Sequence, residues 1–347
     1  MEQDAKQRSR RGRGRPTIAD VARLAGVGAI TVSRALREPD RVSQELRSQI
    51  EAAVDTLGYV PDRNARALAS ARADLVAVLV PSLTNSVFAE VVRGLYDELG
   101  DSSLQIHIGN THYSGLEEER LLRVFLSQRP AAIIVSGIDQ TPVARRMLED
   151  AGCPVVQIME TGPDPIDMMV GFSHFDGGRA VTRHLIDAGY RRVGFLGARM
   201  DPRSQRRLSG YRAAVEDAGL DDPRLVTTTP TPSSVPLGRE LLRDALSRAP
   251  DLDAVFCNND DLALGVLFEC NRAALAVPDR IGIAGFNDLD FMGVASPSLT
   301  SVWTHRYEIG RKTMEMARAA IGGNRPAQRI VDVGFELRIR ESTSRRI

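Results

Sequence analysis

The sequence predicts an α/β protein, in which a small helical unit at the N-terminus is followed by two doubly wound α/β subdomains. Residues 16–60 contain three short amphipathic segments with capping residues and a turn glycine, which is typical of packed helices. From residue 74 onward, short apolar runs suited to buried parallel strands alternate with longer helical patterns. A chain of 347 residues has room for two or three such domains.

The first fifteen residues are basic and offer almost nothing to bury, so we expect no fixed structure there. Within this leader, the sequence RGRGRP at 11–16 resembles an AT-hook core, which could lie in a narrow DNA minor groove. One short match is weak evidence, and a basic arm that adds only nonspecific attraction is the favoured interpretation. The basic residues of the leader are Lys6, Arg8, Arg10, Arg11, Arg13 and Arg15.

Two short helices joined by a tight turn are predicted next. Thr17 is a good N-cap, and Asp20 three residues later can close a capping box. Gly26 allows the sharp turn that lets a second helix, at about 29–36, cross the first. The second helix would turn an apolar side inward, formed by Val32, Ala35 and Leu36.

A third helix is predicted after Ser43, which can cap it, and its apolar residues recur at helical spacing. The three segments together form a helix-turn-helix, whose second helix has the size to enter a DNA major groove. A helical cap on an enzyme is the alternative, but the Arg-rich composition and the basic leader favour DNA binding. The apolar positions of the third helix are Leu46, Ile50, Ala53, Val54 and Leu57.

Buried strands and helices alternate twice in the rest of the chain. The first set of apolar runs lies at 75–80, 104–108, 131–135 and 154–159, and the second set at 168–172, 192–198, 252–258 and 280–286. Each set predicts one open sheet covered by helices, and the terminal strands after residue 300 should cross back between the two sheets. Ligands of such sheets bind beyond the carboxyl ends of the strands. We therefore expect a cleft between two facing sets of strand ends.

Composition narrows the class of protein. A content of 43% hydrophobic and 26% charged residues is ordinary for a soluble globular protein, and no apolar run approaches a membrane span. The basic N-terminus has no apolar segment behind it, so it is no secretory signal, and we expect a cytoplasmic protein. Cys153, Cys257 and Cys270 have no metal-ligand spacing and are expected to be buried thiols. The net charge of zero hides a basic N-terminal end that could meet phosphate.

A family resemblance follows from residues 20–70. The run DVARLAGVGAITVSR, the VS before the third helix, LGYVP and ARAL resemble the headpiece and hinge of LacI/GalR transcriptional regulators. The likeness continues to the C-terminus as that family's sensing domain, which has the fold of periplasmic binding proteins. PSLTNSVFAEVVRGL, MMVGFSHFDGGRAVT, LGARMDP and FCNNDDLALGVLFEC are most similar to gluconate-operon repressors.

The resemblance also implies a domain organisation. Residues 1–15 form the leader, 16–60 the helix-turn-helix domain and 61–73 a hinge. Residues 74–347 form the effector-binding and dimerisation domain. Its subdomains would comprise about 74–172 with 303–331, and 173–302 with 332–347.

For DNA binding, the resemblance implies base contacts from Ala29, Ile30 and Arg34. Arg34 could pair with guanine, whereas Ala29 and Ile30 can only pack against apolar features such as a thymine methyl. Gly28 stands where the family usually has Ser, so a capping and phosphate-binding hydroxyl is missing. Phosphate contacts that position the headpiece are expected from Thr17, Thr31, Ser33, Ser43 and Tyr59.

The hinge is too short to be a stable helix alone. In the family it folds when two copies meet on the operator, and a leucine that corresponds to Leu68 wedges into the minor groove. Ala65 would pack between the two hinges. Asp62 falls where Asn is common, and it could weaken the phosphate contact or cap the hinge helix. Plain packing against the domain behind it is the alternative role for Leu68.

Effector-binding residues are expected at the strand ends. PSLTNS at 81–86 opens a helix and could hold an anion or a hydroxyl, unless Thr84 or Asn85 only caps that helix. The resemblance assigns Arg207 to the effector, where it would pair with a carboxylate, and a solvated surface arginine is the alternative. Asn259 would touch the ligand, with Asp260 capping or bracing the site. The expected set is Ser82, Asn85, Phe88, Glu160, Arg207, Asn259, Asp260 and Asn287, with Phe172 and His174 as further cleft residues.

These residues predict a dimeric repressor that binds a palindromic operator and is released by a small polyhydroxy acid such as gluconate. One arginine with amides and hydroxyls suits an acid better than a neutral sugar, and Asn287 stands where many sugar-binding members have Asp. The same regulator with a neutral sugar or a corepressor remains an alternative. A sugar-acid enzyme finds little support, since the chain has no P-loop, no GxSxG and no HExxH. We expect no cofactor, no metal and no membrane association.

Overall fold

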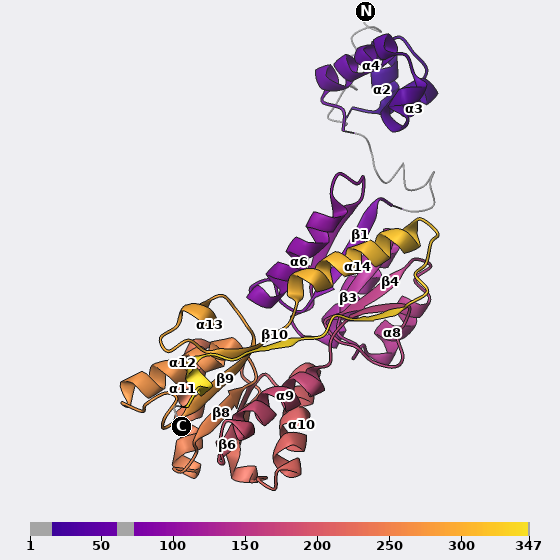
Figure 1. Cartoon of the computed structure of the whole chain (residues 1–347). Coiled ribbons are helices and arrows are strands. Elements are labelled where there is room, and N and C mark those ends of the chain that lie inside the picture. The colour runs from indigo at the N-terminus through magenta and orange to yellow at the C-terminus, as the bar shows by residue number, and fades with distance from the viewer. Residues whose placement is uncertain (1–15, 61–72, 346–347) are drawn as a thin grey trace, which may run out of the picture. The chain divides into compact units, whose positions relative to one another are not determined.

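The computed structural model describes residues 16–60 and 73–345, with Arg37 and Pro39 as backbone only. The chain divides into two compact units, Met1–Ala73 and Asp74–Ile347 (Figure 1). The expectations for the leader, including the RGRGR part of the AT-hook-like sequence, lie outside the described residues. The same holds for the hinge residues Asp62, Ala65 and Leu68.

The N-terminal unit is a helix-turn-helix followed by a third helix, as the sequence predicts. It consists of α2 (Ile18–Leu24), α3 (Ala29–Arg37), a short 3₁₀ turn (Pro39–Arg41) and α4 (Gln44–Leu57). The capping box of Thr17 and Asp20 is present, and Ser43 caps α4 by accepting from the Leu46 amide. Gly26 has a φ of +63°, a conformation that L-residues with a side chain rarely adopt, so this turn depends on glycine.

A small apolar core holds the three helices together. Val21 and Val32 are fully buried where α2 meets α3, and Ile50 brings α4 against them. The Gln49 side-chain amide donates to the Ala25 carbonyl at 3.1 Å, which ties α4 to the end of α2. This core fixes the crossing of α2 and α3 and leaves the outer side of α3 exposed.

The second unit contains two six-stranded, mostly parallel sheets, which confirms the predicted α/β class. The first sheet has the order β11-β5-β4-β3-β1-β2, and the second the order β12-β10-β9-β8-β6-β7. The strands of the first sheet are β1 (Leu75–Val80), β2 (Gln105–Asn110), β3 (Ala132–Ser136), β4 (Val155–Ile158), β5 (Met168–Gly171) and β11 (Ile330–Asp332). Those of the second are β6 (Val193–Ala198), β7 (Val226–Thr229), β8 (Ala254–Cys257), β9 (Gly282–Asn287), β10 (Thr300–Trp303) and β12 (Glu336–Arg338).

Each sheet and its helices form one lobe (Figure 1). We call the lobe of the first sheet the first lobe; its helices are α6 (Ser86–Leu99), α7 (Gly115–Ser127), α8 (Pro142–Glu149) and α14 (Arg306–Ile321). The second lobe holds the second sheet with α9 (His174–Asp187), α10 (Pro202–Asp217), α11 (Val235–Arg248), α12 (Asp260–Arg272) and α13 (Phe291–Val294). The chain crosses between lobes after β5, after β10 and after β11, so both lobes are built from separate stretches of sequence.

Two elements are absent from the sequence-based prediction. The strand β7 reads VTTT, which lacks the apolar run that marks the other strands. Helix α14 comes near the end of the chain, yet it packs beside α6 in the first lobe. The three cysteines are buried thiols outside any disulfide, as expected. Within residues 16–60 and 73–345, no helix is long and apolar enough to cross a membrane.

Candidate functional site

Helix α3 presents the residues expected to read DNA bases. Ala29, Ile30 and Arg34 are all exposed, and Ile30 has 76% of its surface accessible. An isoleucine so exposed gains nothing from the headpiece core, which favours a contact surface over a packing role. Gly28 precedes the helix as its N-cap and provides no side-chain hydrogen bond, as the sequence indicates.

The expected phosphate contacts differ in how available they are. Thr17 donates its hydroxyl to Asp20 at 2.7 Å, and Ser43 accepts from the Leu46 amide, so both already serve as helix caps. Thr31 and Ser33 are half-buried along α3. Tyr59 packs in the headpiece core with 9% of its surface exposed, which leaves little of it for a partner.

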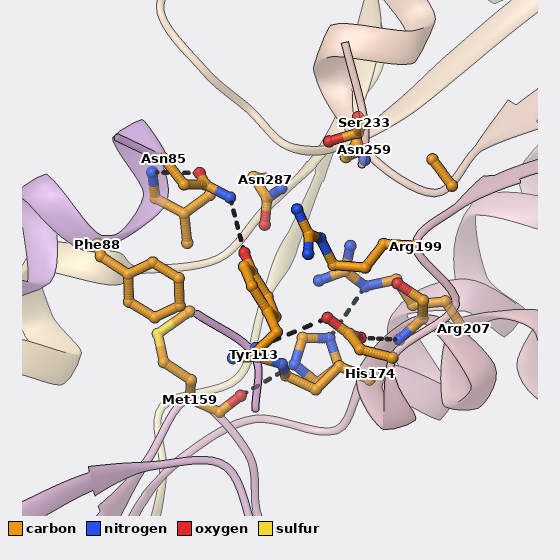
Figure 2. A pocket seen from close by; sticks show the side chains of 15 residues that line it. Asn85, Phe88, Tyr113, Met159, His174, Arg199, Arg207, Ser233, Asn259 and Asn287 are labelled. Atoms are coloured by element: carbon orange, nitrogen blue, oxygen red, sulfur yellow. Dashed lines mark hydrogen bonds and ion pairs between the residues drawn. The ribbon is translucent and has the colours of Figure 1, made fainter. Parts of the chain in front are cut away.

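A cavity of about 500 Å³, open to solvent, lies between the carboxyl ends of the strands of the two lobes. Figure 2 shows its lining, in which side chains from the two lobes face one another. This is the place at which ligands of doubly wound sheets bind. The lining consists of Asn85, Val87, Phe88, Tyr113, Met159, His174, Ala198, Arg199, Asp201, Arg203, Ser204, Arg207, Ser233, Asn259 and Asn287.

Arg207 is held in the cavity wall by three contacts. Its Nε donates to Nδ1 of His174 at 3.1 Å, and its Nη1 donates to the Asn258 carbonyl. The guanidinium also lies 3.9 Å from the centre of the Phe286 ring. Burial lowers the pKa of Arg207 to about 10, so the side chain keeps its charge at neutral pH. Because only 8% of Arg207 is exposed, the alternative of a solvated surface arginine is wrong.

His174 is the neutral partner that Arg207 requires. Burial, and next the charge of Arg207, hold the pKa of His174 well below its usual value. The Nε2 nitrogen lies 2.9 Å from the Met159 carbonyl, so it carries the proton and Nδ1 is free to accept from Arg207. His174 thus orients Arg207 without adding charge to the wall.

The position of Arg207 depends on close packing between α9 and α10. A Cβ atom added at Gly178 of α9 would come within 2.4 Å of the Arg207 carbonyl oxygen. A Cβ atom at Gly210 of α10 would come within 2.0 Å of the Phe175 carbonyl oxygen. Only glycine fits at these two contacts, and a side chain at either would push α10 and its arginines away from the cavity.

Amide groups at two strand ends complete the second-lobe side of the wall. Asn259 is the N-cap of α12 and accepts from the Leu262 amide through Oδ1. Asn287 ends β9, and its Oδ1 is buried with no hydrogen-bond partner among the described residues. A buried acceptor without a partner is costly, so a ligand hydroxyl that donates to Asn287 would be favoured.

Four residues of the wall have positive φ angles without being glycine: Tyr113 (59°), Met159 (73°), Arg199 (63°) and Asn287 (111°). Such conformations cost energy and persist where the surrounding structure enforces them, often at ligand sites. Strained backbone therefore marks this cavity independently of its shape.

The charged residues give the wall a positive balance. Arg199, Arg203 and Arg207 face Asp201, which makes a net charge of 3 − 1 = +2 with His174 neutral. Burial would raise the pKa of Asp201, but the charge of Arg203 and the hydrogen bonds from Ser204 outweigh it and lower that pKa. Asp201 is therefore ionised, and the surplus of positive charge suits an anionic ligand.

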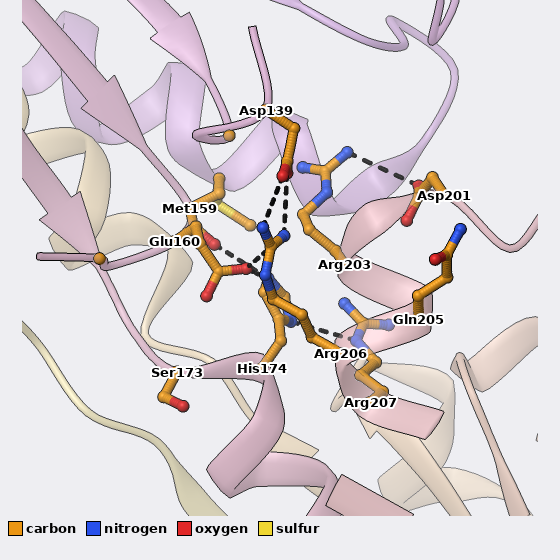
Figure 3. Close-up of polar contacts among 12 residues, drawn as sticks. Asp139, Met159, Glu160, Ser173, His174, Asp201, Arg203, Gln205, Arg206 and Arg207 are labelled. Atoms are coloured by element: carbon orange, nitrogen blue, oxygen red, sulfur yellow. Dashed lines mark hydrogen bonds and ion pairs between the residues drawn. The ribbon is translucent and has the colours of Figure 1, made fainter. Parts of the chain in front are cut away.

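Next to the cavity, side chains of the two lobes join directly (Figure 3). Arg206 of α10 forms a bidentate pair with Asp139 of the first lobe, at 2.8 and 2.5 Å. Its Nη1 also lies 3.5 Å from the carboxylate of Glu160. Arg203 donates to the Ser136 hydroxyl at 3.2 Å. Helix α10 therefore carries two of the three cavity arginines and these contacts between the lobes.

Comparisons with known proteins agree with this architecture. Residues 17–62 match the family model described as "Bacterial regulatory proteins, lacI family", and residues 182–343 match the model "Periplasmic binding protein-like domain". The transcriptional regulator GntR of Pseudomonas aeruginosa is 44% identical over 95% of this chain and 96% of its own length. This chain belongs to the LacI family of DNA-binding transcriptional regulators.

Two further proteins have the same organisation as this LacI-family chain. GntR of Escherichia coli is 41% identical over 93% of this chain and 97% of its own. A crystal structure of a LacI-family transcriptional regulator from Silicibacter pomeroyi superposes with a TM-score of 0.89 at 37% identity. That superposition covers 95% of this chain and all of the other.

Three expected effector residues of this LacI-family chain, and the further cleft residue Phe172, do not line the cavity. The Glu160 carboxylate instead faces Arg206 and His174, behind the wall. Asp260 is fully buried and accepts from the Leu289 amide and the Ser301 hydroxyl, so it braces β9 and β10 against α12. Ser82 accepts from the Thr84 and Asn85 amides in the turn before α6. Phe172 is buried beside His174, with ring centres 4.4 Å apart.

Five expected residues do line the cavity: Asn85, Phe88, Arg207, Asn259 and Asn287, together with His174. Asn85 also caps α6, so the capping role and a place on the wall coincide. Sequence reasoning missed Tyr113, Met159, Arg199, Arg203 and Ser233. Arg199 and Arg203 lie in and just after the LGARMDP segment, whose family resemblance is the signal that could have found them.

Proposed function

We propose that this LacI-family regulator is a dimeric repressor that binds a palindromic operator and leaves it when a small polyhydroxy acid, such as gluconate, binds between the lobes. In a bacterial cell such a protein works in the cytoplasm, where the chromosome is. The observation that carries the choice of effector is the net positive wall of the cavity, combined with amide and hydroxyl groups.

Each part of such a ligand would find matching chemistry. A carboxylate suits the arginine side of the wall, since guanidinium groups form strong charge-assisted hydrogen bonds. Hydroxyl groups suit Asn259 and the Oδ1 of Asn287, which has no hydrogen-bond partner in the described part of the chain. The carbon chain would lie against Phe88 and Met159, which are apolar and buried. The resemblance of four segments to gluconate-operon repressors supports the same class of ligand.

Exposed residues of α3 support the DNA-binding half of the proposal. Ala29, Ile30 and Arg34 would read bases, while Thr17, Thr31, Ser33 and Ser43 would position the headpiece on phosphates. Release requires only that the effector bind one arrangement of the lobes more tightly than the other. An effector that favours the DNA-bound arrangement would act as a corepressor instead.

A neutral sugar is the second candidate effector, because the first-lobe side of the wall has no charged residue. An enzymatic role is not proposed, since the relatives are named as transcriptional regulators.

A thermal-shift titration tests the class of effector. Gluconate, phosphogluconate, other aldonic and hexuronic acids and neutral sugars would each be titrated into the full chain. A ligand at about a hundredfold its dissociation constant adds about 3 kcal/mol of stability, which is a clear shift. We expect a saturable shift with gluconate and release of a labelled operator duplex in the same concentration range. A shift with neutral sugars alone would mean that the effector is a neutral sugar and not an acid. Stronger operator binding in the presence of the ligand would mean that the ligand is a corepressor.

A further inference from the structure

The three arginines of the cavity wall are not equally free to bind a ligand. Arg207 already donates to His174 and to the Asn258 carbonyl. Arg203 donates to the Ser136 hydroxyl and lies 3.8 Å from the carboxylate of Asp201. Among the described residues, the Arg199 side chain has neither a hydrogen-bond acceptor nor a carboxylate as partner. Arg199 is therefore the wall cation with its donors available.

The guanidinium of Arg199 is nevertheless held in place. It lies 4.0 Å from the centre of the Tyr113 ring, which belongs to the first lobe (Figure 2). Asn85 donates to the Tyr113 hydroxyl at 3.4 Å and so steadies the ring. A guanidinium stacked on an aromatic face keeps its edge free, and the N–H donors lie along that edge.

The backbone supports the same orientation. Arg199 and Met200 have φ angles of 63° and 46°, in the left-handed region that residues with a side chain seldom adopt. Hydrogen bonds hold this turn: the Arg199 amide donates to the Thr231 carbonyl and the Gln205 side chain donates to the Met200 carbonyl, each at 2.9 Å. The strained turn after β6 thus holds Arg199 against Tyr113 at the cavity.

We propose that Arg199 is the residue that selects an acid over its neutral counterpart, by donating two hydrogen bonds to the carboxylate of the effector while its face stays on Tyr113. A planar guanidinium edge matches a carboxylate in this bidentate way. Arg207, whose Nε and Nη1 are committed, then positions the ligand without deciding its charge. This inference rests on the proposed acid effector and assigns its specificity to one side chain.

The test compares gluconate with gluconamide, in which a neutral amide replaces the carboxylate. Isothermal titration of the full-length protein would measure both dissociation constants for the unmodified chain and for Arg199→Gln. We expect Arg199→Gln to weaken gluconate about thirtyfold and gluconamide by less than about threefold, so that the preference for the acid is lost. Arg199→Lys keeps the charge without the planar edge and should recover part of that preference.

A matched control is Arg212→Gln, which removes the same charge from an exposed position of α10 away from the cavity. Thermal unfolding measures whether each variant is folded. If Arg199→Gln does not fold, Arg199→Lys still tests the assignment. A preference for gluconate that survives in Arg199→Gln would overturn the assignment and leave the acid effector standing. If the unmodified protein binds gluconate no better than gluconamide, the acid effector fails, and the role of Arg199 fails with it.

Discussion

The two sides of the cavity are built from different kinds of residue. The first lobe contributes Asn85, Val87, Phe88, Tyr113 and Met159, none of which is charged. The second lobe contributes every charged residue of the wall: Arg199, Asp201, Arg203 and Arg207. Both lobes have the same doubly wound architecture, so the difference lies in the residues placed at the strand ends.

This difference suggests a division of work between the lobes. The second lobe would determine the charge of the ligand, because only its residues distinguish an acid from a neutral polyol. The first lobe would cover the ligand and report its presence by closing on it. A change at Arg199 in the second lobe should then alter which ligand binds, whereas changes between the lobes should weaken all ligands alike.

The largest effect is expected from Arg207→Met in the second lobe. This change leaves Nδ1 of His174 and the Asn258 carbonyl buried without their donor. Losing such a buried charged donor should destabilise the protein by about 3 kcal/mol. Gluconate and gluconamide should both lose about a hundredfold in affinity, because Arg207 shapes the wall rather than reading charge. Urea unfolding and isothermal titration measure the two effects.

The contrast with Arg199 makes this prediction specific. If Arg207→Met weakened only the acid, Arg207 would be the charge-reading residue and the division between these two arginines would be wrong. A variant with unchanged stability would mean that the buried contacts of Arg207 contribute little. Arg212→Met on the same helix is a suitable control, since it removes the same charge at an exposed position that does not line the cavity.

A second prediction concerns Glu160, a carboxyl that the first lobe buries beside the cavity. Burial raises the pKa of Glu160 from 4.5 to about 7, against the opposing charge of Arg206. The folded protein therefore holds this proton more tightly than the unfolded chain does. The resulting stability is fully present below about pH 4.5 and is lost as the pH rises through 7, by at most about 3 kcal/mol.

Glu160→Gln should remove this pH dependence while keeping the shape of the side chain. The free energy of unfolding between pH 5 and about pH 8 should fall less steeply in the variant than in the unmodified protein. Glu216→Gln, at an exposed position of α10, controls for the change in charge. An unchanged slope would show that Glu160 stays ionised in the fold, and that the first lobe does carry charge at this boundary.

The sequence predicts the cavity residues that match positions of a family pattern, and it misses others on both lobes. Arg207, Asn259 and Asn287 follow strands that are clear apolar runs, and they match positions of a family pattern. Tyr113 and Met159 also follow strands, but they reach the cavity through positive φ angles, which cannot be predicted from these residue types. Glu160 follows a strand as well, but its carboxylate faces His174 and Arg206 and does not line the cavity.

The fold shows the same limit. Strands that are apolar along their whole length, such as β1 and β3, are predicted almost to the residue. The polar strand β7 and helix α14 are not predicted from the sequence, because their positions in the fold depend on packing. For α14 the partner is α6, more than two hundred residues earlier, where Gly94 and Gly310 allow the two backbones to touch. A local sequence pattern cannot predict contacts between residues that lie so far apart in the chain.

The smallest effect is expected from the bridge between the lobes (Figure 3). Arg206 and Asp139 have side chains 30% and 36% exposed, so their pair should be worth about 1 kcal/mol. Asp139→Asn and Arg206→Gln should each weaken gluconate and gluconamide equally, by about fivefold, because they loosen the closed arrangement rather than the wall. Titration of the two single variants and the double variant gives the coupling energy between the two side chains.

A bridge within one lobe supplies the control that decides the interpretation. Arg179 and Asp217 pair at 2.8 Å between α9 and α10, both in the second lobe, with side chains 53% and 48% exposed. Asp217→Asn should therefore leave both ligand affinities unchanged, although it removes the same kind of ion pair. If Asp139→Asn weakened the acid alone, the first lobe would take part in reading charge through Asp139. If it affected neither ligand, closure would not depend on this bridge, and the covering role of the first lobe would rest on Phe88 and Tyr113.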